Sequence, residues 1–202
     1  MTKIKLCGLS RLCDIEWANE LRPDFVGFVL SGGYRRTVSH ERAEAMKAAL
    51  SPGIAAVGVF VDEAPEAVAR LLNRGVIDCA QLHGHEDETY CAVLRALTDR
   101  PIIQAFRVKT PEDAARARRS GADHVLLDSG AGTGTAFDWS LVAGVRRDYF
   151  LAGGLTPENA AAAVRMLHPW GVDVSSGIET DGLKDKDKMA AFVAAVRKED
   201  AR

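Results

Sequence analysis

The sequence predicts an α/β fold in a single domain over residues 1–202, a (β/α)8 barrel with eight parallel strands. First, eight short apolar runs rich in β-branched or aromatic residues recur along the chain. Second, these runs begin roughly 20 to 30 residues apart, and most gaps between them show helical spacing, which is typical of βαβ units. Third, eight units favour a closed TIM barrel, because open doubly wound sheets usually stop at about five or six strands.

The predicted strands follow one another without a long linker. In chain order they read IKLC (4–7), FVGFVL (25–30), AAVGVFV (55–61), IDCAQLH (77–83), IIQAFRV (102–108), DHVLLD (123–128), YFLAGG (149–154) and VDVSSG (172–177). Each run is short enough for one strand and is followed by turn residues or polar positions.

The predicted helices rest on apolar stripes and on start signals. One stripe joins Val68, Leu71 and Leu72 after Ala64, and a second joins Ala160, Ala163, Val164 and Leu167. Two helices share a start signal, TPED at 110–113 and TPEN at 156–159. In each, Thr caps the helix, Pro takes the first helical position, and Glu faces the positive end of the helix dipole.

Charge and composition point to small-molecule partners. The net charge is −2 and no acidic or basic block occurs, so neither a nucleic acid nor an anionic membrane is an expected partner. The N-terminal segment shows no leader pattern, and no apolar run is long enough to cross a bilayer. We therefore expect a cytoplasmic protein with a small-molecule partner, and the sequence leaves open whether it is a monomer or a homodimer.

No cofactor and no metal are expected. The four cysteines form no CxxC pair and lie near no histidine cluster, which argues against a zinc site or a redox motif. No GxGxxG motif follows the first strand and no GxxxxGK[ST] motif occurs, so a nucleotide cofactor has no recognisable site.

Polar residues repeat at every second position near the carboxyl ends of several predicted strands. Alternate strand residues face the barrel interior, and active sites of this fold lie at the carboxyl-terminal mouth. The residues with this pattern are Lys5 and Cys7, Gln81 and His83, Asp173 and Ser175, and Asp128 at the end of its strand. We expect Lys5 and Asp173 to pair, because an unpaired buried charge costs several kcal/mol.

Each of these residues also has a purely structural interpretation. Cys7 alone is typical of a small buried apolar residue, Asp128 of a loop cap, and His83 of a hydrogen-bonded residue at the mouth. Their convergence on one rim is the observation that favours a functional site.

Two glycine-containing loops near the end of the sequence predict a phosphate site. Gly153 and Gly154 offer backbone N–H groups just before a helix, and Ser176 and Gly177 follow the last strand. The spacing of Ser176 and Glu179 predicts a capping box for a short extra helix. A third loop, GAGTG at 130–134, is interpreted either as a lid over a ligand or as a flexible connection.

The sequence resembles the phosphoribosylanthranilate isomerases of tryptophan biosynthesis over nearly its whole length. The motifs that carry the resemblance are, in order, KLCGLSR, DFVGFVL, RRTVS, VGVFVDE, AQLHG, LLDS, GTGTAFDW, LAGGLTPEN and VDVSSGIE. The resemblance implies a cofactor-free Amadori rearrangement, in which an aminoaldose becomes an aminoketose.

By similarity, Asp128 is the general acid that protonates the furanose ring oxygen, and Cys7 is the general base that removes the C2′ proton. Asp128 must then keep a proton above the usual aspartate pKa of roughly 3.9, and Cys7 must supply a thiolate although a free cysteine has a pKa near 8.5. A low-dielectric mouth raises the first pKa, and nearby cations lower the second.

The resemblance also assigns residues that bind the substrate. An arginine in RRTVS holds the anthranilate carboxylate, and the alignment places it at Arg36, with the adjacent Arg35 as the alternative. His83 and Asp173 match positions that line the family's site. Three residues depart from common family patterns: Thr37 after the arginine pair, Gln104 in the fifth strand, and Thr135 in the loop after Asp128.

Two alternatives stay open. The first is a dual-substrate isomerase that also opens the related aminoaldose of histidine biosynthesis, although barrels acting on that substrate use two aspartates and two phosphate sites. The second is a barrel without catalytic activity that binds a phosphorylated metabolite, against which the presence of both Cys7 and Asp128 argues.

Overall fold

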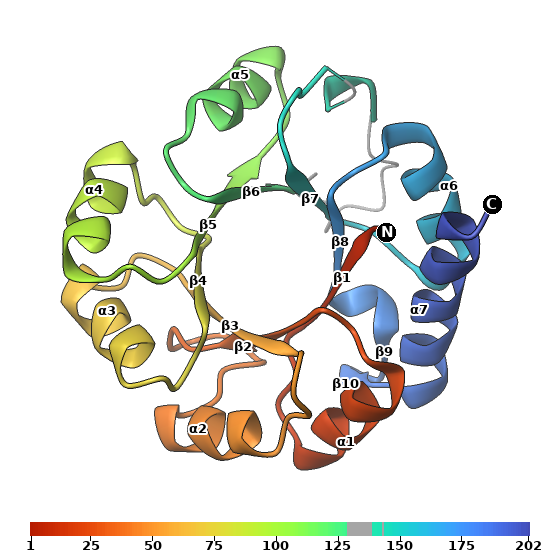
Figure 1. Cartoon of the computed structure of the whole chain (residues 1–202), viewed down its shortest axis with the longest axis horizontal. Helices are drawn as coiled ribbons and strands as arrows, with labels where there is room; N and C mark the ends of the chain where they lie inside the picture. Colours follow the sequence, from red (N-terminus) through yellow and green to blue (C-terminus); the bar gives the residue numbers. More distant parts are fainter. Residues whose placement is uncertain (129–138, 143) are drawn as a thin grey trace.

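The computed structural model describes residues 1–128, 139–142 and 144–202, and the described chain forms a closed barrel of eight parallel strands surrounded by helices (Figure 1). The strands pair in chain order, and the last strand pairs with the first. They are β1 (Lys3–Cys7), β2 (Phe25–Val29), β3 (Ala55–Phe60), β4 (Cys79–Leu82), β5 (Ile102–Arg107), β6 (His124–Asp128), β7 (Tyr149–Ala152) and β8 (Gly171–Val174). The predicted fold class and all eight predicted strands are therefore confirmed.

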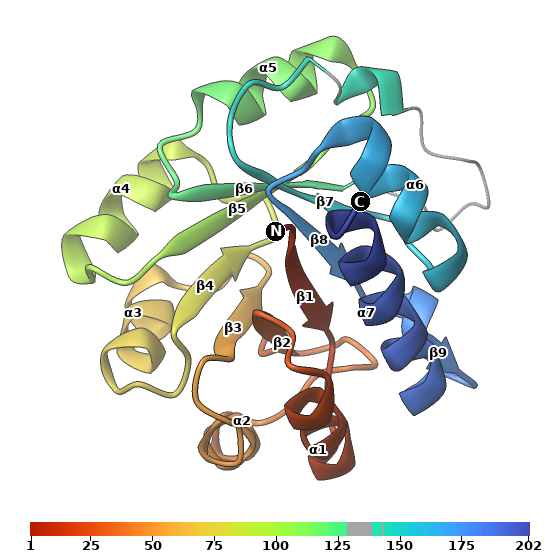
Figure 2. The ribbon, with the colours of Figure 1, turned by 45° about the vertical axis from the view of Figure 1, so that its right-hand side comes forward.

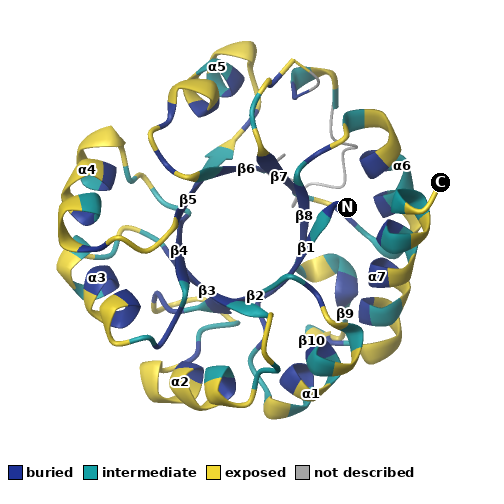
Figure 3. Ribbon diagram, in the orientation of Figure 1, coloured by how far each residue is buried: buried dark blue, intermediate teal, exposed yellow. Residues whose placement is uncertain are grey.

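Seven α-helices are described outside the strands. They are α1 (Leu12–Leu21), α2 (His40–Ala48), α3 (Pro65–Asn73), α4 (Glu88–Leu97), α5 (Pro111–Arg119), α6 (Pro157–Leu167) and α7 (Lys186–Asp200). Each helix turns a buried face to the strands and an exposed face outward (Figure 3). Between β6 and β7 the described residues hold only the single turn η1 (Trp139–Leu141). None of the described helices is both long and apolar enough to span a bilayer.

The two ends of the chain lie on the same side of the barrel wall. Helix α7 packs against α6 and α1 (Figure 2). The backbone N–H of Thr2, just before β1, donates to Asp200 Oδ2 at 2.9 Å, at the end of α7. These contacts support the junction of β1 and β8, which carries part of the site described below.

The helix start signals behave as the sequence predicts. Thr110 caps α5 through its hydroxyl, and the carboxylate of Asp113 accepts in return from the Thr110 backbone N–H at 3.0 Å. In α6 the side chain of Asn159 accepts from the Thr156 backbone N–H at 2.8 Å. Both helices begin at a proline, whose missing N–H would find no partner in the first turn anyway.

Strand parity separates two apolar cores. Ile4 and Leu6 of β1 pack outward under the helices, in the larger core. The interior core contains alternate residues of several strands, and Phe25, Phe150 and Trp170 fill its end near the amino termini of the strands. Lys5 and Cys7 have the interior parity, so their polar groups reach the opposite, carboxyl-terminal mouth.

The extra helix after β8 differs from its prediction. Ser176–Ile178 forms one 3-10 turn, η2, and its cap residue Ser175 makes no side-chain capping hydrogen bond. Glu179 does not complete a capping box, because its carboxylate is bound by Arg35, Arg36 and Lys184. Glu179 instead opens a two-stranded antiparallel ribbon, β9 (Glu179–Thr180) with β10 (Leu183–Lys184).

Candidate active site

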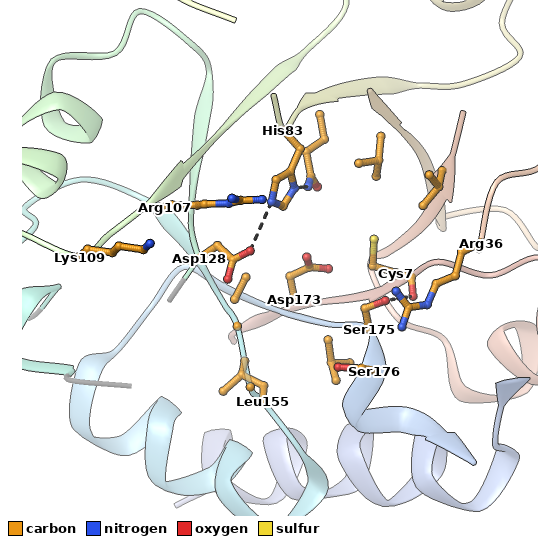
Figure 4. Close-up of a pocket in the computed structure, with 17 residues that line it drawn as sticks. Cys7, Arg36, His83, Arg107, Lys109, Asp128, Leu155, Asp173, Ser175 and Ser176 are labelled. Atoms are coloured by element: carbon orange, nitrogen blue, oxygen red, sulfur yellow. Dashed lines mark hydrogen bonds and ion pairs between the residues drawn. The ribbon is translucent and has the colours of Figure 1, made fainter. Parts of the chain in front are cut away.

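A cavity of about 490 Å³ opens at the carboxyl-terminal mouth of the barrel (Figure 4). Its size is in the range of small-molecule sites. Of the residues that the sequence analysis singled out as site residues, those that line it are Cys7, Arg36, His83, Asp128, Gly153, Gly154, Asp173 and Ser176. Gly177 is adjacent to the lining but is not part of it.

Cys7 ends β1 and is buried at the wall of the cavity. Burial raises the pKa of its thiol above the usual value, because the low-dielectric surroundings disfavour the thiolate. The positive charges of Lys5 and Lys184 oppose this shift, whereas the negative charge of Asp173 adds to it. The cations expected near Cys7 are present, but they do not offset the effect of burial, so the pKa of the thiol is raised.

Lys5 lies below Cys7 and pairs with Asp173 as predicted. The distance from Lys5 Nζ to Asp173 Oδ1 is 2.9 Å, and the side chain of Lys5 is completely buried. Burial lowers the pKa of Lys5, but the charges of Asp173 and Cys7 outweigh it, so the net pKa is raised and the side chain stays an ammonium. The interior below the thiol therefore contains a permanent ammonium group together with its carboxylate counterion.

Two further residues hold the backbone around Cys7, and the sequence analysis assigned them no role there. The hydroxyl of Ser175 donates to the Cys7 carbonyl at 3.0 Å. Lys184 Nζ donates to the Ser175 carbonyl at 2.8 Å and is almost entirely buried. A charged residue on a two-residue strand gives no periodic signal, so Lys184 could be found only from the fold.

Asp128 ends β6 and forms a hydrogen-bonded pair with His83, which follows β4. His83 Nε2 lies 3.3 Å from Asp128 Oδ2, and the two side chains are 24% and 21% exposed. His83 Nδ1 lies 2.8 Å from Nε2 of Gln81, a buried residue of β4. This side of the mouth is thus open to solvent, in contrast to the closed surroundings of Cys7.

Arg36 reaches the cavity from the loop after β2, where it meets a carboxylate of the protein itself. Arg36 Nε and Nη2 donate to the two oxygens of Glu179 at 2.6 and 2.9 Å. Burial raises the pKa of Glu179, but the hydrogen bonds from Arg36 and Lys184 outweigh it and lower the pKa to about 2. Arg35 also binds Glu179, from the exposed side. Of the two arginines, Arg36 lines the central cavity.

The predicted phosphate loops lie side by side at the mouth. Gly153 and Gly154 have φ angles of 85° and 66°, in a region that favours glycine, and α6 begins shortly after them. A Cβ atom on Gly177 would overlap the Leu155 carbonyl oxygen, so only glycine lets the second loop approach the first so closely. The two loops therefore approach each other closely beside the cavity.

Arg107 and Lys109 also line the cavity, although no motif in the sequence marks them. Arg107 is paired in register with Asp128 across β5 and β6, and its side chain points toward His83 and Asp128 (Figure 4). Neither cation forms an ion pair with a described residue. They lie at and just after the end of β5, and their residue types do not distinguish them from the other arginines and lysines of the sequence.

The three departures from family patterns have different outcomes. Gln104 does not line the central cavity: its amide accepts from Ser120 Oγ at 2.5 Å and donates to the Glu86 carbonyl at 2.8 Å. Thr37 fixes the loop after β2 by donating to the Ser31 carbonyl at 2.8 Å. Thr135 and the GAGTG segment at 130–134 lie outside the described residues.

Comparison with known proteins identifies related chains over almost the whole length. The family model for N-(5'phosphoribosyl)anthranilate (PRA) isomerase matches residues 4–195. The N-(5'-phosphoribosyl)anthranilate isomerase of Acetivibrio thermocellus is 43% identical over 99% of this chain and 98% of its own.

Solved structures agree with this result. A phosphoribosyl anthranilate isomerase in complex with reduced 1-(o-carboxyphenylamino)-1-deoxyribulose 5-phosphate is 34% identical, with a TM-score of 0.87 over 98% of this chain and 100% of its own. Monomers generated from the dimeric enzyme of Thermotoga maritima are 33% identical, with a TM-score of 0.86 and the same coverage. Both forms of assembly are thus represented among the relatives.

Proposed function

The chain belongs to the N-(5'-phosphoribosyl)anthranilate isomerase family, and from that premise we propose that Cys7 is the general base and Asp128 the general acid of its reaction. The reaction of the family is an isomerisation in tryptophan biosynthesis. The observation that carries the residue assignment is that Cys7 and Asp128 line one cavity from β1 and β6, with the two glycine loops between them.

The acid step opens the sugar. A protonated Asp128 gives its proton to the furanose ring oxygen, the C1′–O bond breaks, and the nitrogen lone pair forms a protonated Schiff base. Asp128 is suited to this step because it lies at the mouth, where a ligand reaches it, and because His83 holds its carboxyl group at 3.3 Å.

The base step forms the enolamine. The Cys7 thiolate removes the C2′ proton, the electron pair moves toward the Schiff-base carbon, and the resulting enolamine tautomerises to the aminoketose. Because burial raises the pKa of the thiol while Lys5 and Lys184 lower it, the two ammonium groups are what makes a thiolate accessible here. The rate is expected to increase as the pH rises toward the pKa of Cys7.

The two ends of the substrate are held by different groups. The N–H groups of Gly153, Gly154 and the Ser176–Gly177 segment suit a phosphate. Arg36 suits the anthranilate carboxylate: Glu179 occupies one edge of its guanidinium, and the Nη1 group has no hydrogen bond to a described residue. His83 and Asp173 line the space between these ends and orient the reacting groups.

The test generates phosphoribosylanthranilate in situ from anthranilate and activated phosphoribose and follows the loss of its fluorescence. Cys7→Ser and Asp128→Asn are each expected to lower kcat by about 10²–10⁴ with little change in folding. Cys13→Ser and Asp99→Asn, which change the same side-chain types outside the cavity, serve as matched controls and should retain full activity. An inactive wild-type protein would refute the activity, and full activity in both cavity variants would refute the assigned roles.

A second candidate function is isomerisation of the aminoaldose of histidine biosynthesis, which carries two phosphates. Arg107 and Lys109 favour it, because they place cationic charge on the β5 side of the cavity, away from the glycine loops. Turnover of that substrate by the wild type, lost in Arg107→Met, would support a second activity. Absence of turnover at high enzyme concentration would exclude it.

A further inference from the structure

Gln81 lies deeper in the barrel than the pair formed by His83 and Asp128. It belongs to β4, two residues before His83, so both side chains face the barrel interior, and that of Gln81 is buried. Gln81 Nε2, the two ring nitrogens of His83 and Asp128 Oδ2 form a chain with distances of 2.8 and 3.3 Å. The group that contacts one ring nitrogen of His83 therefore influences whether the other ring nitrogen carries a hydrogen.

In the arrangement seen here, the hydrogen of the His83 ring faces Asp128. The Gln81 amide N–H donates to His83 Nδ1, so Nδ1 is an acceptor and carries no hydrogen. The hydrogen of the neutral ring is then on Nε2 and is donated to Asp128 Oδ2, so this oxygen accepts. While it accepts from Nε2, Oδ2 does not carry the proton that opens the sugar.

The Gln81 amide has a second orientation available. Its carbonyl oxygen Oε1 is buried and has no partner among the described residues, so no hydrogen bond at that end holds the amide in its present orientation. The two ends of an amide have nearly the same shape, so a half-turn exchanges them. Gln81 Oε1 would then accept a hydrogen bond from the N–H at His83 Nδ1. His83 Nε2 would carry no hydrogen and could accept from a protonated Asp128.

From this geometry we propose that Gln81 is a positioning residue that sets the direction of the hydrogen bond between His83 and Asp128. With the amide N–H toward His83, Asp128 Oδ2 accepts a hydrogen from Nε2; with the carbonyl toward His83, Oδ2 carries a proton and donates it to Nε2. Loading takes one proton from solvent, and Asp128 delivers that proton to the ring oxygen of the substrate. The inference rests on the acid role proposed for Asp128 and explains how a carboxyl group that is about one-fifth exposed presents a proton when it is needed.

Other charged groups face the pair and affect how readily it loads. Arg107 points at it from β5, and Lys109 lies further along the same rim (Figure 4). Asp173 faces it from β8, with its charge balanced by Lys5, and Cys7 and Arg36 lie across the cavity. Because these groups are unchanged by substitutions at Gln81, differences between Gln81 variants report on the amide itself.

The direct test is the tautomer of His83 in the unliganded protein. Long-range ¹H–¹⁵N spectra of histidine-labelled protein distinguish a hydrogen on Nδ1 from one on Nε2, and His83→Asn identifies the His83 signals among the five histidines. At pH 8 the wild type should carry its hydrogen on Nε2. In Gln81→Glu, whose carboxylate only accepts, the hydrogen should move to Nδ1; in Gln81→Met it should stay on Nε2.

The kinetic test is the pH profile of kcat, with KM measured beside it. Gln81→Glu should keep Asp128 protonated to higher pH, so the basic limb should move up by about one pH unit. Gln81→Met should lower kcat about tenfold or more and move the basic limb down, with KM nearly unchanged. Gln104→Glu and Gln104→Met are matched controls, because Gln104 is a buried glutamine of the next strand whose hydrogen bonds go to Ser120 and Glu86 and not to His83.

The outcomes separate this inference from the function on which it rests. An unchanged His83 tautomer in Gln81→Glu, or equal movement of the basic limb in the Gln104 variants, would overturn the role of Gln81. If instead Asp128→Asn kept full activity while the tautomer still responded to Gln81, the acid role of Asp128 would fail and the catalytic meaning of the switch with it.

Discussion

The two sides of the cavity place their proton-transferring groups in opposite surroundings. On the side of β1 and β8, Cys7 is buried among charged groups, with Lys5 and Asp173 paired at 2.9 Å below it. On the side of β4 and β6, Asp128 is about one-fifth exposed and is hydrogen-bonded to a histidine with an amide behind it.

The difference shows that one barrel mouth tunes an acid and a base by separate means. A buried thiol needs fixed cations to become a thiolate, and fixed cations must themselves be neutralised, so this side contains a network of charges. A carboxyl group that must load and release a proton benefits from contact with solvent.

The largest effect is expected from Lys5→Met. The substitution leaves Asp173 as an unpaired charge in the interior, which should lower the free energy of unfolding by about 3–5 kcal/mol. It should also raise the pKa of Cys7 further, because the largest opposing influence on that pKa is removed. Denaturant unfolding and the pH dependence of Cys7 alkylation measure the two effects.

The double variant Lys5→Met with Asp173→Leu is the matched control for that experiment. It removes both charges and should recover most of the lost stability while leaving the alkylation of Cys7 slow. If the single and double variants were equally unstable, the Lys5–Asp173 pair would not be the reason for the loss.

A smaller effect is expected from Glu179, which belongs to the charged side through Lys184 and Arg36. Its pKa of about 2 in the folded protein lies below the unfolded value of roughly 4.3. Its contribution to stability is therefore fully present above about pH 4.3 and is lost as the pH falls through 2. Because Glu179 becomes protonated over this range, we expect the free energy of unfolding to fall by about 2 kcal/mol.

Glu179→Gln tests this linkage and the orientation of Arg36 together. The variant should lose part of the acid dependence of stability between pH 5 and pH 2, measured by denaturant unfolding at each pH. It should also raise KM several-fold with a small change in kcat, because Arg36 loses the carboxylate that holds one edge of its guanidinium. An unaltered KM would show that Arg36 keeps its position without Glu179.

The smallest effect concerns salt and separates the two sides directly. Arg107 and Lys109 are cations at the open side without an ion pair to a described residue, so screening should weaken their attraction for an anionic substrate. Between about 0.05 and 0.5 M salt we expect KM to rise about two- to fivefold, with a smaller rise in Arg107→Met. The pKa of Cys7, measured by alkylation, should hardly change, because buried charges are screened little.

Much of the site follows from periodicity in the sequence. The eight strands, and the parity that turns Lys5, Cys7, Gln81, His83, Asp128 and Asp173 inward, are set by alternation that each short segment displays by itself. The helix start signals before Pro111 and Pro157 are equally local, and the structure confirms them. Such features need no knowledge of distant residues, because they depend on backbone geometry and on neighbours within a few positions.

The wrong prediction and the missed residues have a common physical cause. Ser176 and Glu179 have the spacing of a capping box, yet the fold brings Arg36 from 143 positions away to the same carboxylate, and a charged bidentate pair outweighs a local cap. Lys184 beside Ser175 and Arg107 beside Asp128 depend likewise on which elements the closed barrel makes neighbours.

By itself the sequence determined the closed barrel, the inward-facing polar residues and the glycine loops at the mouth, because these depend on local spacing and side-chain type. Only the tertiary structure decided that Cys7 lies over a buried ion pair, that Glu179 binds Arg36, and that the Gln81 amide meets His83. Those arrangements are set by distances between strands and loops far apart in the chain, and burial and charge at such distances determine where each proton resides.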